Sequence, residues 1–305
     1  MDVNLGIPAA IAAAAVWAAS SVMMASQLSR VDAALVSAVR LAWAAALFLL
    51  LLAARGDVSA IGDAGWSNSL QLIAGAIVGL ALGDTVYVVT LGILGAGRAY
   101  TASLGLFTVF TFVLSAIVLD EPVTATVVAG SVLVVGSVYL VALLGTAGQG
   151  VEASLDRVRP AGPGLMRGLG LVVFASLCWA VATVWLGHAG EGVSTVAIGA
   201  IRIPAAAIVV GLLVSLRRDA ALRWRSVPRG AMAVLGIAGL AGTGFGSLLF
   251  IYAIQEAGAG RTAVLSSLSP LFAVPLGAVW LREPITGWVA VGTVLAVLGI
   301  MLISV

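Results

Sequence analysis

The chain has 305 residues, of which 62% are hydrophobic and only 9% are charged, and its mean hydropathy is +1.18. Soluble domains carry about 25% charged residues, so the composition excludes an ordinary soluble protein and predicts one that lies in lipid. The net charge is only +2, and because all 15 basic residues are arginine, chemistry that needs a lysine, such as a retinal Schiff base, is excluded.

Ten apolar stretches are each about long enough to cross a bilayer. They cover residues 6–26, 33–54, 69–94, 99–119, 123–144, 164–186, 194–216, 229–254, 262–281 and 285–305. A backbone in lipid must satisfy its own hydrogen bonds, and the alternating segments of about ten residues that a barrel needs do not occur. The sequence therefore predicts an all-α membrane protein with ten transmembrane helices and no soluble domain.

Two arginines lie deep inside apolar stretches, and each follows a tryptophan by 23 positions. Trp17 lies in the first stretch and Arg40 in the second. In the same way, Trp179 lies in the sixth stretch and Arg202 in the seventh. A charge inside a bilayer is costly and usually faces a partner or a wet cavity. The two tryptophans lie midway along their helices, where an interfacial belt explains them poorly, so a cavity lining is the alternative interpretation.

The third stretch contains Asp84, which is the only acid well inside a predicted span. It lies in GAIVGLALGDTVY, where Gly75, Gly79 and Gly83 recur every four residues and predict a close helix-packing face. Two interpretations of Asp84 remain open at this stage. The carboxylate either neutralises Arg40 or carries a proton whose release depends on substrate.

The chain reads as a duplication. GAGR at 95–98 matches GAGR at 258–261, SLGLF at 103–107 matches SLSPLF at 267–272, and DEPVT at 120–124 matches REPIT at 282–286. The boundaries are a first five-helix repeat at 1–144, a Gly- and Pro-containing linker at 145–163 and a second five-helix repeat at 164–305. An odd number of spans per repeat places the second copy upside down, with a substrate site near the midplane where the repeats meet.

The second repeat differs from the first at the position of the acid. Its stretch GIAGLAGTGFGSLLFIY offers Ser247 but no carboxylate, so Arg202 lacks the partner that Arg40 has. An unpaired arginine is the better candidate for a substrate carboxylate or phosphate. The glycines at 236–246 predict an interrupted helix, and Pro270 and Pro275 predict a kinked, hydroxyl-lined helix that carries Ser266.

Other residues have structural interpretations. Glu121-Pro122 and Glu283-Pro284 lie at span boundaries, where the proline favours the first turn of the next helix and the acid its N-terminal dipole. One cysteine, Cys178, and one histidine, His188, leave few catalytic sets. HExxH and GxxxxGK[ST] are both absent, so no enzyme activity, metal or cofactor is expected.

The ten spans, the 5+5 duplication, the paired arginines and the repeated Glu…Gly pattern (Glu121 to Gly130, Glu283 to Gly292) together resemble the drug/metabolite transporter superfamily, in particular its EamA-like family. The resemblance covers nearly the whole chain. It implies a multi-pass carrier of the cytoplasmic (inner) membrane that works by alternating access, exports small organic metabolites such as amino acids, and is coupled to protons or exchange. The implied substrate-binding residues are Trp17, Ser20, Arg40, Tyr87, Trp179, Thr183, Arg202, Ser247 and Ser266, with Asp84 as the proton-coupling candidate.

Orientation and partners complete the expectations. The arginine distribution, eleven in one set of loops against two in the other, favours both termini outside, whereas members of the family commonly keep both termini in the cytoplasm. The expected partners are a small-molecule substrate, the lipid bilayer and coupling protons, with no nucleic acid, and the chain is expected as a monomer or homodimer. The alternatives are a passive channel or facilitator of the same fold and a non-transporting membrane subunit.

Overall fold

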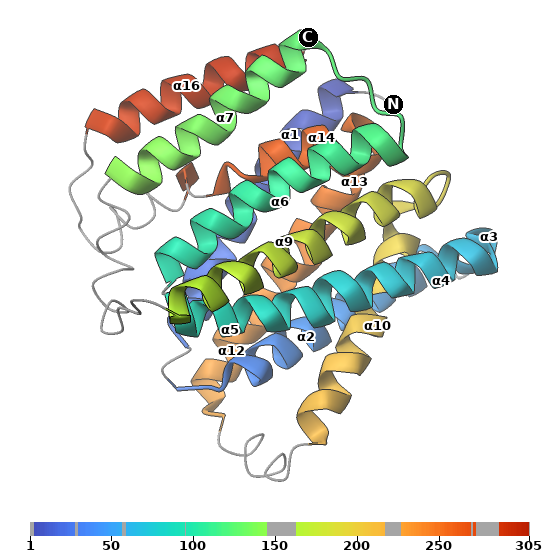
Figure 1. Ribbon diagram of the computed structural model, residues 1–305. Helices are drawn as coiled ribbons and strands as arrows, with labels where there is room; N and C mark the ends of the chain where they lie inside the picture. The colour runs from blue at the N-terminus through green and yellow to red at the C-terminus, as the bar shows by residue number, and fades with distance from the viewer. Residues whose placement is uncertain are drawn as a thin grey trace.

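The structure is a computed structural model that describes residues 3–27, 30–56, 59–94, 96–144, 163–216, 227–269, 271–272 and 287–304. Every regular element among these residues is a helix (Figure 1). We refer to the described residues before 145 as the first half and to those after 162 as the second half. The all-helical prediction is confirmed for this part of the chain.

The first half contains eight helical segments. They are α1 (Val3–Ala25), α2 (Ala33–Arg55), α3 (Ser59–Asp63), α4 (Gly65–Ala76), the π-helix η1 (Ile77–Gly83), α5 (Asp84–Leu94), α6 (Ala96–Val118) and α7 (Ala125–Leu144). The turn before α2 is capped by Asp32, whose carboxylate accepts from the Ala34 N–H, and Gly56 ends α2 in the left-handed conformation at φ 65°. Since α4, η1 and α5 follow one another without a break, residues 65–94 form one continuous rod.

The second half contains seven helical segments. They are α9 (Pro163–Ala189), α10 (Thr195–Ser215), α12 (Arg229–Ala238), the π-helix η2 (Gly239–Gly246), α13 (Ser247–Ala257), α14 (Ala259–Ser266) and α16 (Gly287–Ser304). Ser194 caps α10 by accepting from the Ala197 N–H. Here too, α12, η2 and α13 form one continuous rod, over residues 229–257.

Five helices in the described residues are long and apolar enough to cross a membrane: Ala34–Arg55, Gly65–Tyr87, Met166–Ala189, Thr195–Ser215 and Arg229–Ala257. Shorter apolar helices cover Leu5–Ser20, Ala102–Val118, Ala125–Ser137 and Val294–Ile303. Large side chains such as Leu50, Ile117 and Leu216 are exposed on the outer surface, as expected for a protein whose solvent is lipid. The chain is therefore a helical membrane protein, and the count of ten spans stays a prediction.

Three parts of the chain on which predictions depend lie outside the described residues: most of the linker at 145–163, the stretch at 217–226 that holds four of the eleven arginines, and the prolines at 270 and 275. The orientation and the kinked ninth span therefore stay predictions.

The helices of the two halves are interleaved. In the second half, α9 packs against α4, η1, α5 and α6, while α10 packs against α2 and α4. In the first half, α1 packs against α13, η2 and α14. α7 and α16 form a close pair at one side of the molecule (Figure 1), where a Cβ on Gly130 would lie 2.6 Å from the Gly299 carbonyl oxygen. Polar residues on α1, α2, η1/α5, α9 and η2 are thereby brought to one region.

The two π-helices mark equivalent places in the two halves. π-Helices are rare, and short ones occur often at functional sites. The backbone N–H of Asp84 donates to the carbonyl of Gly79, five residues back, which is the wider pattern of η1. The glycine run at 236–246 therefore widens the helix into η2 and does not break it, which corrects the expectation of an interrupted helix.

Candidate functional site

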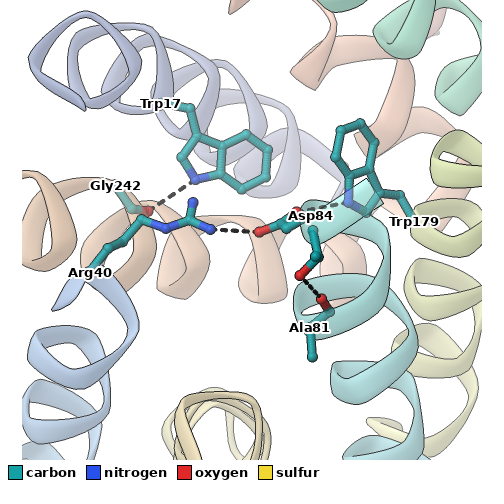
Figure 2. Close-up of polar contacts among 7 residues, drawn as sticks. Trp17, Arg40, Ala81, Asp84, Trp179 and Gly242 are labelled. Atoms are coloured by element: carbon teal, nitrogen blue, oxygen red, sulfur yellow. Dashed lines mark hydrogen bonds and ion pairs between the residues drawn. The ribbon is translucent and has the colours of Figure 1, made fainter. Parts of the chain in front are cut away.

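An ion pair at the start of α5 joins two charges of the membrane interior. A terminal nitrogen of the Arg40 guanidinium lies 2.6 Å from Oδ2 of Asp84 (Figure 2). The side chains are 18% and 17% exposed, so both are largely desolvated. The predicted contact of Asp84 with Arg40 is therefore present, because α2 and the rod that carries Asp84 bring the two side chains together. The proton-carrying role of Asp84 stays a prediction.

The second carboxylate oxygen of Asp84 is bonded from the other half. Trp179, on α9, donates its indole N–H to Oδ1 of Asp84 over 2.9 Å. Asp84 thus accepts one charge-assisted bond from the first half and one hydrogen bond from the second, and each carboxylate oxygen has a donor. Asp84 is therefore held by side chains of both halves, and a substrate site at this place stays a prediction.

Trp17, on α1 of the first half, makes the equivalent contact to an acceptor in the second half. Its indole N–H donates over 3.0 Å to the carbonyl of Gly242, within η2 (Figure 2). One turn further along α1, the Ser20 hydroxyl donates over 2.9 Å to the carbonyl of Ala238, just before η2. α1 is therefore tied to the second half by two polar bonds, and the Ser20 hydroxyl is used in helix packing.

Glycines at both π-helices make these tryptophan contacts possible. A Cβ on Gly83, the last residue of η1, would lie 3.0 Å from the indole nitrogen of Trp179. A Cβ on Gly246, the last residue of η2, would lie 2.7 Å from the indole nitrogen of Trp17. Asp84 and Ser247 are then each the first residue after a π-helix. The predicted correspondence of Asp84 with Ser247 is thus seen in the local structure.

The glycine stripe before Asp84 has the packing role that the sequence predicted. A Cβ on Gly79 would lie 2.6 Å from the Cβ of Ala182, and one on Gly75 would lie 3.6 Å from the Cβ of Trp185. Both contacts are with α9. The stripe therefore sets the close approach of α9 that brings Trp179 to Asp84.

Aromatic rings surround the two indoles. The ring centroids of Tyr87 and Trp179 are 5.1 Å apart, and those of Trp17 and Phe250 are 4.9 Å apart. Phe107, on α6, packs edge-on against Trp179 at 6.3 Å. Sequence reasoning missed Phe107 because nothing in its local sequence shows that α6 packs against α9. These rings form an apolar wall on both sides of the ion pair.

Arg202 is buried without the partner that Arg40 has. The residue is 8% exposed on α10, and its Nε has no hydrogen-bond partner. Among the described residues, the Arg40–Asp84 pair is the one salt bridge, so no described carboxylate neutralises Arg202. Within the described residues, the charge pairing of the two halves therefore differs, and a substrate role for Arg202 stays a prediction.

Among the described residues, no hydrogen bond joins the remaining predicted site residues to the ion pair. Thr183 is buried on α9, and Ser247 is half-buried at the start of α13. Ser266 is buried on α14, where its hydroxyl donates to the Thr262 carbonyl of its own helix. A substrate role for these three stays a prediction.

Glu121 has a role that its sequence context did not indicate. Its carboxylate accepts from the backbone N–H groups of Ala259 and Gly260, at the N-terminus of α14. It therefore caps a helix of the other half, and α7 begins only at Ala125, so Pro122 does not occupy its first turn. The expectation of a cap on its own following helix is wrong for Glu121. Glu283 lies outside the described residues.

Metal binding has no support in the described part of the chain. Within these residues, no three side chains of His, Cys, Asp or Glu are grouped so that they could hold an ion. The site consists of the Arg40–Asp84 ion pair, two indole N–H groups that are both bonded, and the aromatic rings that pack against the indoles. Such a set suits recognition of an organic molecule with a polar group.

Comparisons with known proteins identify relatives over nearly the whole chain. The model of the EamA-like transporter family matches twice, over residues 4–143 and 166–305. A protein of Archaeoglobus fulgidus described as an uncharacterized transporter is 24% identical over 262 residues, which are 85% of this chain and 84% of that protein. A solved crystal structure has a TM-score of 0.72 at 19% identity and covers 97% of this chain and 95% of its own, which shows a shared fold.

Proposed function

The chain belongs to the EamA-like transporter family, and from that membership and the site we propose that it is a secondary transporter exporting small organic metabolites, such as amino acids, by alternating access. It is a membrane transporter by family, and the substrate class, direction and mechanism are the proposal. We place it in the cytoplasmic membrane as a multi-pass protein, with no cofactor.

One observation carries the proposal. Asp84 of the first half is held at once by Arg40 of the same half and by Trp179 of the second half. Alternating access needs a polar centre at the boundary of two bodies, so that relative movement of the bodies changes the contacts of that centre. The reciprocal bond from Trp17 to Gly242 gives the opposite boundary an equivalent contact.

The arrangement of helices supports two inverted repeats of five spans. The family model matches each half separately. Each half also contains one π-helix whose last residue is a glycine, and one tryptophan that lies against the corresponding glycine of the other half. In such a transporter, rocking of one repeat against the other exposes the centre to each side in turn. The Trp17 and Trp179 bonds lie where that movement would act.

Asp84 is the proposed proton carrier. Protonation of its carboxylate would remove the negative charge that Arg40 pairs with and would weaken the bond from Trp179 at the same time. One proton would therefore loosen a contact within the first half and a contact between the halves. Trp17, Ser20, Arg40, Tyr87, Trp179, Thr183, Arg202, Ser247 and Ser266 are the proposed substrate-lining residues.

The test begins with an untargeted comparison of metabolites released by cells that make the chain and by cells that make the Asp84→Ala variant. The compound that differs is then used for counterflow in proteoliposomes of the purified chain. Trans-stimulation by unlabelled compound inside the vesicles is the expected result, because a carrier returns faster when loaded. Flux without trans-stimulation would show a channel or facilitator, and flux equal to empty vesicles would contradict transport.

A further inference from the structure

The described interior of the protein holds two arginines and one acid. Among the described residues, the charged residues far from either end of a helical rod are Arg40, Asp84 and Arg202. The other charged residues lie near the end of a rod or outside the rods. Arg40 and Asp84 neutralise one another at 2.6 Å. One positive charge, that of Arg202, is left over in this part of the chain.

Burial makes that leftover charge unusual. Arg202 is buried, at 8% exposed, whereas Arg40 is half-buried. An arginine that snorkels to the interface would be exposed at its head. The Nε of each arginine lacks a hydrogen-bond partner, but among the described residues only Arg40 has a carboxylate beside it. A desolvated guanidinium without a carboxylate is costly unless another anion takes that place.

We propose that Arg202 is the binding site for a single carboxylate of the transported compound, so that the substrates are compounds with one carboxylate, amino acids among them. This inference deepens the proposed function and rests on it. A planar guanidinium binds one carboxylate through two parallel N–H···O bonds and one unit of charge. A phosphate dianion would leave one negative charge unbalanced, because Arg40 is already paired.

The test uses two acid–amide pairs of equal shape: butyrate with butyramide, and phenylacetate with phenylacetamide. The purified full chain in detergent is titrated with each compound at constant ionic strength, and the midpoint of thermal unfolding is followed. We expect at least one acid to raise the midpoint in a saturable way and to bind about tenfold or more tightly than its amide. The outcome in which neither acid shifts the midpoint, or in which acid and amide act equally, overturns the proposal.

Variants locate the effect. Arg202→Gln should abolish the shift by the acid, and Arg202→Lys should keep the charge but weaken binding about tenfold through loss of the bidentate geometry. Arg55→Gln, which removes an exposed arginine in the last turn of α2, is the matched control and should keep the full shift. An acid-dependent shift that persists in Arg202→Gln contradicts the assignment. If Arg202→Gln does not fold, the acid–amide comparison on the wild-type chain still decides the matter.

The two proposals fail separately. Selective binding of the acids without trans-stimulation in proteoliposomes would leave the carboxylate site standing and remove the transport mechanism. Trans-stimulated transport of a neutral or cationic compound, with no acid selectivity, would leave the transport mechanism standing and remove the carboxylate site.

Discussion

Trp17 and Trp179 make reciprocal hydrogen bonds across the boundary between the halves, but their acceptors differ in kind. Trp179 donates to the carboxylate of Asp84, whereas Trp17 donates to the backbone carbonyl of Gly242. The two contacts occupy equivalent places beside the two π-helices. The proposed proton carrier therefore takes part in one boundary contact and not in the other.

The first prediction follows from that difference. Trp179→Phe should lower stability by about 2 kcal/mol and change the pH dependence of transport, because it removes a bond to a charged acceptor. Trp17→Phe should cost about 1 kcal/mol and leave the shape of the pH profile unchanged. Thermal unfolding and flux measured from pH 5 to pH 9 on both variants check this. Identical pH profiles for the two variants would contradict a role of Asp84 in coupling.

The second prediction concerns the ion pair itself. Arg40→Gln or Asp84→Asn alone leaves one largely desolvated charge without its partner, and each should destabilise the protein by about 3 kcal/mol. The double variant removes both charges, so its loss of stability should be smaller than the sum of the losses in the two single variants. A double-mutant cycle by thermal unfolding measures the coupling. A coupling near zero would show that solvent already screens the pair.

Part of this site could be predicted from the sequence alone. The equal spacing of Trp17 to Arg40 and Trp179 to Arg202 marks two copies of one unit, and a single acid inside a span has few possible partners. Asp84 pairing with Arg40 follows from these facts, since an unpaired charge in lipid is costly. The packing role of the glycines before Asp84 also follows, because their spacing keeps them on one helix face.

The contacts between the halves could not be predicted in the same way. Trp179 donating to Asp84 and Glu121 capping α14 depend on which helices of the two halves are neighbours, and no local pattern encodes that. The glycines of η2 are compatible with a packed helix, a broken one or a π-helix, because glycine permits all three. The tertiary packing of α1 and α9 selects among them.

The third prediction tests the close approach of α9. Gly79→Ala should destabilise the protein by about 1–3 kcal/mol, because the new methyl group would lie 2.6 Å from the Cβ of Ala182. Adding Ala182→Gly removes the clash and should recover part of the loss. Gly136→Ala is the control, since a Cβ there meets nothing within 4 Å on α7, and should be neutral or slightly stabilising. Thermal unfolding of the three variants measures these effects, and a destabilisation by Gly136→Ala equal to that of Gly79→Ala would show that the close contact with Ala182 is not its cause.

The fourth prediction concerns the cap that joins the halves. The Glu121 carboxylate accepts from two N–H groups at the first turn of α14, which begins after Gly258 at φ 88°. Glu121→Gln keeps the shape of the side chain but removes its charge, so that the helix dipole and the charge-assisted bonds lose about 1–2 kcal/mol. Asp120→Asn is the matched control, because it also removes one negative charge. The Asp120 side chain is exposed, and asparagine tolerates the φ of 51° at this position. The free energies of unfolding of the two variants should therefore differ by the full loss expected for Glu121→Gln. Hydrogen exchange at the Ala259 and Gly260 amides should become faster only in Glu121→Gln. Equal exchange in both variants would mean that α14 is held by its apolar packing and that the carboxylate contributes nothing to its first turn.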